Sequence, residues 1–220
     1  FNLPSSVKML KVSAEVANIA LDKERCLSFV EQQGIAVPKH GVVGQTSPSV
    51  WPVIVKPRSG QGSKGISIAE TAVDFDRVAG DGYIWQELLL PAEEEYTCAV
   101  YRSPAVGTRV LILRRTLRGG LTDRGEVVAD SEIESYVRSI ADALAVNGVI
   151  NIQLRMTSVG PRLFEINPRL SSTVMFRHRL GFKDLQWWLA EQTGEHVAGD
   201  FVPPQAGIRF YRGSSEYIIR

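Results

Sequence analysis

Residues 51–69, WPVIVKPRSGQGSKGISIA, are the stretch that decides the fold class of this chain. The apolar run at 51–57 predicts a buried strand, and ISIA at 66–69 predicts a second short strand. The segment between them, RSGQGSKG at 58–65, is a turn rich in glycine and serine. The stretch therefore predicts a β-hairpin with Lys56 at the end of its first strand and a glycine-rich tip.

The turn GQGSKG at 60–65 matches the pattern G-x-G-x-x-G, which alone is weak evidence. A dinucleotide-binding fold needs a helix directly after the glycines, whereas a strand follows here. A Walker A loop needs Lys-Ser or Lys-Thr after its glycine, whereas Gly65 is followed by Ile66. A protein kinase has its glycine hairpin before the lysine strand, and here Lys56 comes first.

What remains is a hairpin flap over a phosphate. Glycine has no side chain, so backbone N–H groups can approach phosphate oxygens closely, and Lys56 would add a positive charge from a rigid strand end. A hairpin without a ligand is the alternative, and this segment alone does not decide between them.

Elsewhere, strands and helices mix without a strict βα alternation. This mixture predicts an α+β fold with antiparallel sheets. The polar segment LRGGLTDRGE at 117–126 is predicted to be a turn region, and Ser131 is predicted to cap a helix that ends at Asn147-Gly148. The predicted helices are 22–33, 71–79, 131–146 and 183–192, and the remaining predicted strands are 83–89, 96–102, 109–115, 149–156, 161–167 and 207–212.

The strands at 149–156 and 161–167 are predicted to form a hairpin across the turn TSVG. Side chains alternate between the two faces of a strand. We therefore expect Phe164 and Ile166 to face the core, and Leu163 to face the opposite side together with the polar residues.

On that polar side, Gln153, Glu165 and Asn167 should lie together. All three carry hard oxygen donors, which suit Mg²⁺ when nucleotide phosphates complete its shell. Arg169 lies two residues further on, where it could neutralise a phosphoryl group in transfer. The alternative is a solvated polar face of a half-exposed sheet.

Composition excludes several classes of protein. The chain has 220 residues, 44% of them hydrophobic and 22% charged, which is ordinary for a globular domain. A net charge of +1 gives no basic excess for nucleic acid. There is no run of about 20 apolar residues that would span a membrane. The two cysteines, Cys26 and Cys98, lie in apolar stretches, so we expect reduced core thiols and a cytoplasmic protein.

Several motifs occur in an order that resembles the ATP-grasp superfamily, with a carbamoyl-phosphate-synthetase-like flavour and amino-acid ligases as more distant relatives. The resemblance covers roughly residues 20–175. Its motifs are DKERCLSFVEQQGIAVP at 22–38, VIVKP at 53–57, GQGSKG at 60–65, WQELL at 85–89, EEEYT at 93–97, NIQL at 151–154 and FEINPRLSS at 164–172.

The resemblance implies a role for each matching residue. Gln153, Glu165 and Asn167 would bind Mg²⁺, and Arg169 and Lys56 would be catalytic. Relatives often bind substrate near the positions of Arg177 and Arg179, so a contact with a substrate carboxylate is one interpretation of these residues, and solvated arginines are the alternative. The implied ATP-binding residues are Lys23, Lys56, Ser59, Gly60, Gly62, Ser63, Gly65, Glu87, Leu88, Leu89 and Glu95.

The acid that holds the ribose hydroxyls has two candidates. Its pairing with Tyr96 favours Glu95, whereas the spacing from Glu87 that is common in relatives favours Glu94. Our prediction is Glu95. Glu87 is expected to accept from the adenine amino group, with the backbone of Leu88 and Leu89 along the ring edge.

The implied activity is an ATP- and Mg²⁺-dependent ligase that joins a small carboxylate to an amine through an acyl phosphate. The alternative is a nucleotide-binding module without independent ligase activity, such as a regulatory or partial-synthetase subunit. The expected partners are small molecules and neither nucleic acid nor a membrane, and a homodimer is left open.

The implied organisation has two lobes, a small lobe at 21–86 with the flap and a large lobe at 87–220 with the Mg²⁺ site. Because the chain begins Phe1-Asn2-Leu3 without methionine, we expect residues 1–20 to be a linker from an N-terminal lobe outside this sequence.

Overall fold

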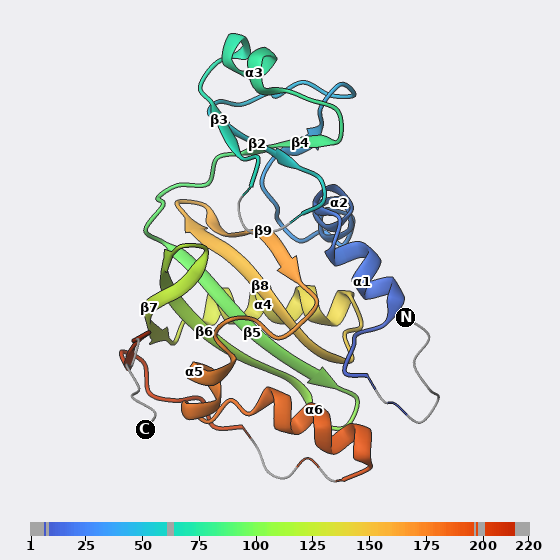
Figure 1. The fold of residues 1–220 in the computed structure, drawn as a ribbon, viewed down its shortest axis with the longest axis vertical. Helices are drawn as coiled ribbons and strands as arrows, with labels where there is room; N and C mark the ends of the chain where they lie inside the picture. The colour runs from blue at the N-terminus through green and yellow to red at the C-terminus, as the bar shows by residue number, and fades with distance from the viewer. Residues whose placement is uncertain (1–6, 8, 61–63, 196, 198–200, 214–220) are drawn as a thin grey trace, which may run out of the picture.

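A computed structural model describes residues 7, 9–60, 64–195, 197 and 201–213. The fold is α+β, with helices packed on two antiparallel sheets, as the sequence predicts (Figure 1). A four-stranded sheet lies at one end of the molecule and a six-stranded sheet at the other. The predicted nucleotide contacts Gly62 and Ser63 lie outside the described residues.

The smaller sheet has the strand order β1-β4-β2-β3. Helix α3 (Ala72–Val78) packs against β3, and Thr71 caps its start, since the Oγ1 of Thr71 accepts from the N–H of Asp74 at 3.2 Å. The strands are β1 (His40–Val42), β2 (Val53–Pro57), β3 (Ser67–Ala69) and β4 (Tyr83–Glu87).

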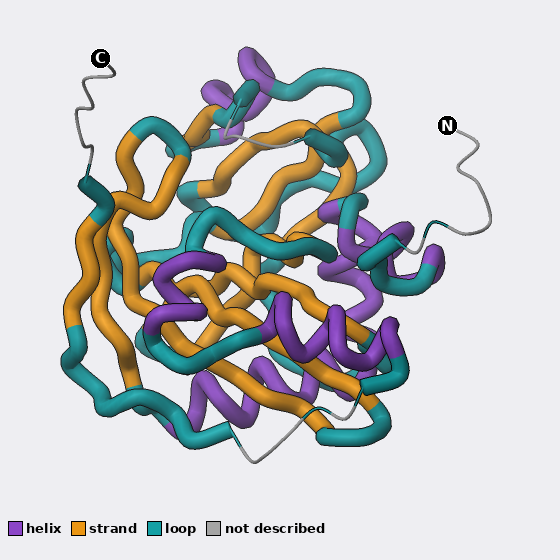
Figure 2. Tube along the Cα trace, turned by 60° about the horizontal axis from the view of Figure 1, so that its bottom comes forward, coloured by secondary structure: helices purple, strands orange, loops and turns teal. Residues whose placement is uncertain are grey.

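The larger sheet has the order β10-β7-β6-β5-β8-β9 and carries helices on both faces. Figures 1 and 2 show α4 (Ser131–Ala143) on one face and α6 (Asp184–Thr193) on the other, and α5 (Val174–Arg179) precedes α6. The strands are β5 (Glu95–Ser103), β6 (Gly107–Arg118), β7 (Leu121–Val128), β8 (Gly148–Thr157), β9 (Gly160–Asn167) and β10 (Arg209–Tyr211).

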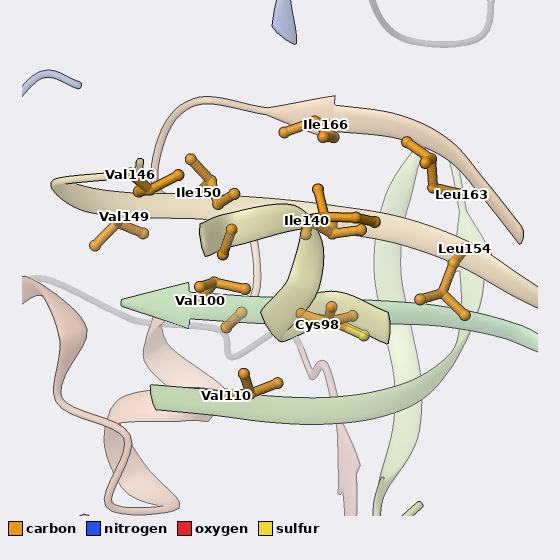
Figure 3. Close-up of a cluster of buried hydrophobic side chains, with 14 of the residues drawn as sticks. Cys98, Val100, Val110, Ile140, Val146, Val149, Ile150, Leu154, Leu163 and Ile166 are labelled. Carbon is orange, nitrogen blue, oxygen red and sulfur yellow. The ribbon is translucent and has the colours of Figure 1, made fainter. Parts of the chain in front are cut away.

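The main core lies between α4 and the larger sheet. Ile140 of α4 is fully buried and packs against Cys98 and Ile150 of the neighbouring strands β5 and β8 (Figure 3). Buried residues recur on α4 at Ile133 and Val137, one helical turn apart, which is the pattern of an amphipathic helix on a sheet. This packing makes the larger sheet a rigid platform for the polar residues on its other face.

Two N-terminal helices lie beside the point where the sheets approach each other. Helix α1 (Ala14–Ala20) packs against α2 (Lys23–Gln32), and α2 contacts both β1 and β9. Asp22 caps the start of helix α2, and its Oδ1 accepts from the N–H of Arg25 at 3.1 Å. Because α2 contacts a strand of each sheet, it lies close to both sheets.

The prediction of a turn region at 117–126 is wrong. Strands β6 and β7 continue through most of this segment and form a long hairpin. The hairpin turns at Gly119 and Gly120, whose φ values are 58° and 78°, a conformation that glycine adopts without strain. The polar side chains of this segment belong to the exposed end of the hairpin. This end extends past the hydrophobic core, so its strands do not need an apolar face.

The predicted limits of α4 also need correction. Its N-cap is Asp130, whose Oδ1 accepts from the N–H groups of Glu132 and Ile133 at 2.9 Å, and Ser131 is the first helical residue. The helix ends at Ala143, and Gly148 already belongs to β8. Aspartate competes well with serine at a cap because its carboxylate accepts two N–H groups here.

Cys26 and Cys98 are both buried and free, as predicted. Among the described residues, no helix has the length and apolar character needed to cross a membrane.

Candidate functional site

A cleft of about 340 Å³ lies between the smaller and the larger sheet. Glu87 and Gly65 are not among its lining residues. The predicted site residues that do line it are Lys23, Lys56, Ser59, Gly60, Leu88, Leu89, Glu95, Gln153, Glu165, Asn167 and Arg169.

Lys56 places a buried cation in this cleft. Its residue is only 4% exposed, and its Nζ donates to the Oε1 of Gln86 at 2.7 Å and to the carbonyl of Phe164 at 3.3 Å. Burial and then the nearby charge of Lys23 lower the pKa of Lys56 from 10.5 to about 8, while Glu165 opposes the shift. A bound anion such as phosphate would favour the protonated amine.

Phe164 reaches the cleft because β9 contains a β-bulge. The pairing of β8 with β9 shifts just after Gln153, so Glu165 lies opposite Gln153 and Phe164 is the extra residue. As a result Leu163 is fully buried in the core, while Phe164 lines the cleft. The predicted orientation of these two side chains is therefore wrong. The bulge also leaves the Phe164 carbonyl available to accept from Lys56.

The oxygen-bearing wall of the cleft consists of Gln153, Glu165 and Asn167. Glu165 is the cross-strand partner of Gln153, and Asn167 follows two residues later on the same face. One carboxylate and two amide oxygens fit Mg²⁺. Among the described residues there is no group of three or more His, Cys, Asp or Glu side chains that could hold a metal ion. Beside this wall, the Nη2 of Arg169 donates to the Oδ1 of Asn167 at 3.2 Å.

Glu95 lines the cleft, whereas Glu94 is not among its lining residues. Glu95 accepts from the Nη2 of Arg115 at 3.0 Å and from the Nη2 of Arg155 at 3.3 Å. The Oε2 of Glu94 accepts instead from the hydroxyl of Tyr96 at 2.5 Å. Of the two candidates for a ribose contact, the position of Glu95 is the more suitable.

A family profile described as "ATP-grasp in the biosynthetic pathway with Ter operon" matches residues 88–215, more than half of the chain. The chain belongs to this ATP-grasp family. The matched range contains the oxygen-bearing wall and Glu95, whereas Lys56 and the flap precede it.

Curated relatives agree with this assignment. The chain is 25% identical over 201 residues to the carbamoyl phosphate synthase large chain of Archaeoglobus fulgidus, covering 78% of this chain and 18% of the relative. The corresponding protein of Thermotoga maritima is 24% identical over 207 residues, covering 77% and 18%. The chain thus spans less than a fifth of the length of these relatives.

Solved structures share the ATP-grasp fold at low sequence identity. N5-carboxyaminoimidazole ribonucleotide synthetase from Thermus thermophilus has a TM-score of 0.71 and 17% identity, covering 88% of this chain and 57% of that one. A biotin carboxylase β,γ-ATP complex from Campylobacter jejuni has a TM-score of 0.72 and 16% identity, covering 86% and 50%. An L-amino acid ligase from Bacillus licheniformis has a TM-score of 0.65 and 15% identity, covering 80% and 48%.

In this ATP-grasp chain, Leu88 and Leu89 follow β4 and line the cleft. The carbonyl of Leu89 accepts from the Nη1 of Arg155 at 2.7 Å. Glu87 does not line the cleft, and its Oε2 accepts from the backbone N–H of Lys39 at 3.2 Å. The structure therefore brings the two leucines to the cleft but not the Glu87 carboxylate.

Residues 58–60, at the base of the predicted flap, are bound to the start of α2 by Arg58. Its Nε donates to the Oδ2 of Asp22 at 2.8 Å, and its Nη2 donates to the Oε2 of Glu24 at 2.9 Å. The backbone N–H of Lys23 donates to the Arg58 carbonyl at 3.0 Å, and the Nζ of Lys23 donates to the carbonyl of Gly60 at 3.0 Å. These four contacts hold the described part of the flap beside Lys23.

The expected contact of Arg177 with a substrate carboxylate is wrong. Arg177 has no exposed surface, and its guanidinium donates to Asp184 at 2.5 Å and to the hydroxyls of Ser171 and Thr173 at 2.6 and 2.8 Å. Burial raises the pKa of Asp184 and Arg177 opposes this. Arg179 is exposed and does not line the cleft. Arg177 instead supports the loop whose Ser171 lines the cleft.

Sequence reasoning missed the roles of Arg58 and Arg155. The alternation of β8 already places Arg155 on the face of Gln153, so that signal was available. No local pattern identifies Arg58, because its partners on α2 are more than 30 residues away.

Proposed function

We propose that this ATP-grasp chain is an ATP- and Mg²⁺-dependent ligase that joins a small carboxylic acid to an amine through an acyl phosphate. The observation that carries the proposal is the contact between the Nζ of Lys56 and the carbonyl of Phe164, the neighbour of Glu165. Lys56, which we propose to bind phosphate, and Glu165, which we propose to bind a metal, both line the same cleft. The similar biotin carboxylase was solved as a β,γ-ATP complex, which supports ATP as the nucleotide.

The cations of the cleft suit the difficulty of this reaction, which is to bring two anions together. Lys23, Lys56 and Arg169 all line the cleft and can neutralise the triphosphate and the attacking carboxylate. Gln153, Glu165 and Asn167 would hold Mg²⁺, which supplies further charge neutralisation at the phosphates.

The proposed chemistry has two steps. A carboxylate oxygen attacks the γ-phosphorus, the bond to the bridging oxygen of ADP breaks, and an acyl phosphate forms. The amine nitrogen then attacks the acyl carbon, phosphate leaves, and the amine loses a proton to solvent. The flap held by Arg58 would exclude water, which otherwise hydrolyses the acyl phosphate.

A second candidate is a nucleotide-binding module that needs another domain for ligation. The observation in its favour is the length of the chain, which spans 18% of the carbamoyl phosphate synthase large chains that it matches. Both candidates predict nucleotide binding, and only the first predicts turnover by this chain alone.

The test measures ADP release from Mg–ATP with pooled amino acids and simple amines. The ligase proposal expects ADP release that depends on an acid and an amine, and loss of this activity in Glu165→Gln. Glu70→Gln, which changes an exposed carboxylate outside the cleft, is the matched control. Nucleotide binding without turnover under any mixture supports the second candidate, and turnover retained in Glu165→Gln contradicts the metal assignment.

A further inference from the structure

A second cavity of about 640 Å³ adjoins the nucleotide cleft on the side of helix α1. Lys56, Glu95 and the leucines after β4 do not line it, so it is a separate space with a common wall. The residues that line both cavities are Lys23, Ser59, Gly60, Glu165, Asn167 and Arg169. These residues belong to the start of α2, the base of the predicted flap, the oxygen-bearing wall and the loop after it. The end of a bound triphosphate is expected beside them.

The far wall of the second cavity is apolar. It includes Val12 and, on α1, Ala14, Ala17 and Ala20, with Leu21 at the end of the helix. Small side chains on one face of α1 leave room between this helix and the end of β9. A ligand in this space would therefore bury an uncharged, apolar body of moderate size.

Most of the charged residues that line the cavity are positive. Lys11, Lys23 and Arg169 are positive, and Glu165 alone is negative. Two of the three cations, Lys23 and Arg169, lie at the wall that both cavities share. Since Glu165 is also the one carboxylate proposed to bind Mg²⁺, the cavity favours an anionic group at its inner end and disfavours a free cationic amine there.

We propose that the second cavity is the site of the acid substrate, and that this substrate is a monocarboxylic acid with an apolar side chain. Its carboxylate lies at Lys23 and Arg169, and its side chain lies along Ala14 and Ala17 of α1. This inference rests on the proposed ligase function, because it places the attacking carboxylate at the wall shared with the nucleotide cleft.

In this arrangement the nucleotide and the acid bind in two separate cavities that share one wall. The nucleotide enters between the sheets, the acid enters beside α1, and their reacting groups approach across residues common to both spaces. A bulky or charged side chain on α1 would then select among acids without changing the nucleotide site. Position 14 is the most direct place for such a change, because Ala14 lines the cavity and is exposed, so a larger residue should not disturb the core.

The experiment compares Ala14→Phe with Asn18→Phe. Both residues are exposed on α1, but Asn18 does not line the cavity, so the second variant controls for a new aromatic side chain on the same helix. Binding of propanoate, 4-methylpentanoate and 3-phenylpropanoate, which carry a carboxylate and an apolar chain but no amine, is measured by calorimetry with Mg²⁺ and a saturating non-hydrolysable ATP analogue. The ligand control is 4-methylpentanamide, which has the same apolar chain as 4-methylpentanoate but no carboxylate.

We expect 4-methylpentanoate or 3-phenylpropanoate to bind wild type and Asn18→Phe equally and to bind Ala14→Phe at least tenfold more weakly. We expect no binding of 4-methylpentanamide. The affinity of the ATP analogue should stay within twofold in all three proteins. Equal acid binding by Ala14→Phe, binding of 4-methylpentanamide, or no binding of any of the three acids to wild type overturns this proposal. Acid and nucleotide binding without ADP release under any mixture refutes the ligase function instead and leaves the acid site in place.

Discussion

Replacing Lys56 with methionine should stabilise the nucleotide-free protein at neutral pH while weakening its affinity for ATP. Lys56 is 4% exposed, and burial lowers its pKa from 10.5 to about 8. A shift of this size corresponds to about 3.4 kcal/mol of destabilisation while the amine is charged in both the folded and the unfolded chain. The buried ammonium is thus a cost to folding that only an anionic ligand offsets.

The direction in which stability changes with pH follows from the number of protons that Lys56 binds in the folded and in the unfolded chain. Between pH 8 and 10.5 the unfolded chain keeps the Lys56 proton while the folded chain has lost it, so the free energy of unfolding rises with pH in this window. Below pH 8 both states are protonated and the full cost is present. From pH 7 to pH 9.5 the contribution of Lys56 to the free energy of unfolding should rise by about 2 kcal/mol.

The loss of two hydrogen bonds reduces the gain in stability that we expect for Lys56→Met. Methionine cannot donate to the Oε1 of Gln86 or to the carbonyl of Phe164, and each acceptor left without its donor costs about 1 kcal/mol or more. The difference between the variant and wild type is therefore best measured as a function of pH, because these losses do not titrate and cancel from the slope.

The assay is urea denaturation of wild type, Lys56→Met and Lys39→Met at pH 7 and 9.5 without nucleotide. Lys39 is exposed, so its variant should follow wild type at both pH values. The stability advantage of Lys56→Met over wild type should shrink by about 2 kcal/mol at the higher pH. An unchanged difference would show that Lys56 is not held in a desolvated, charged state and would refute the reasoning.

Three further predictions concern other contacts. Arg58→Gln, which removes the ion pairs with Asp22 and Glu24, should weaken binding of an ATP analogue about tenfold by calorimetry. Arg77→Gln, which removes an exposed pair on α3, should leave this affinity unchanged, and equal affinities in the two variants would contradict the role of Arg58. Arg177→Met leaves Asp184 buried without its partner and should lower the free energy of unfolding by about 3–5 kcal/mol in urea, with much of the loss recovered in Arg177→Met/Asp184→Leu. A single variant as stable as wild type would exclude a structural role for the pair. Gly65→Ala should lower the melting temperature of the protein more than Gly34→Ala does. Both glycines have a positive φ, but only a Cβ added at Gly65 lies within 2.9 Å of the Tyr83 hydroxyl. Equal decreases in melting temperature for the two variants would count against crowding at Gly65.

Much of the site could be predicted from sequence because its residues lie close together along the chain. Glu165, Asn167 and Arg169 fall within five residues, and a strand period of two is enough to place the first two on one face. The glycine turn after Lys56 is equally local. The cap of α2 at Asp22 and the buried face of α4 follow from helix geometry in the same way.

Other features depended on contacts between distant segments. The bulge that turns Phe164 into the cleft arises from the pairing of β9 with β8, and no property of the sequence around Phe164 marks it. Glu87 and Arg177 match expected positions in the chain, yet their side chains are engaged by Lys39 and Asp184.

The sequence by itself determined the antiparallel α+β fold, the lysine-bearing strand before the glycine-rich segment, and the set of polar residues on β8 and β9, because these follow from short-range periodicity and residue type. Only the tertiary structure decided that Lys56 lies beside the oxygen-bearing wall, that Arg58 joins the segment after β2 to α2, and that a second cavity opens beside α1. The contact of Arg58 with Glu24 spans 34 positions of the chain, and that of Lys56 with Phe164 spans 108. Their geometry is set by how the two sheets and α1 pack, which local sequence patterns do not encode.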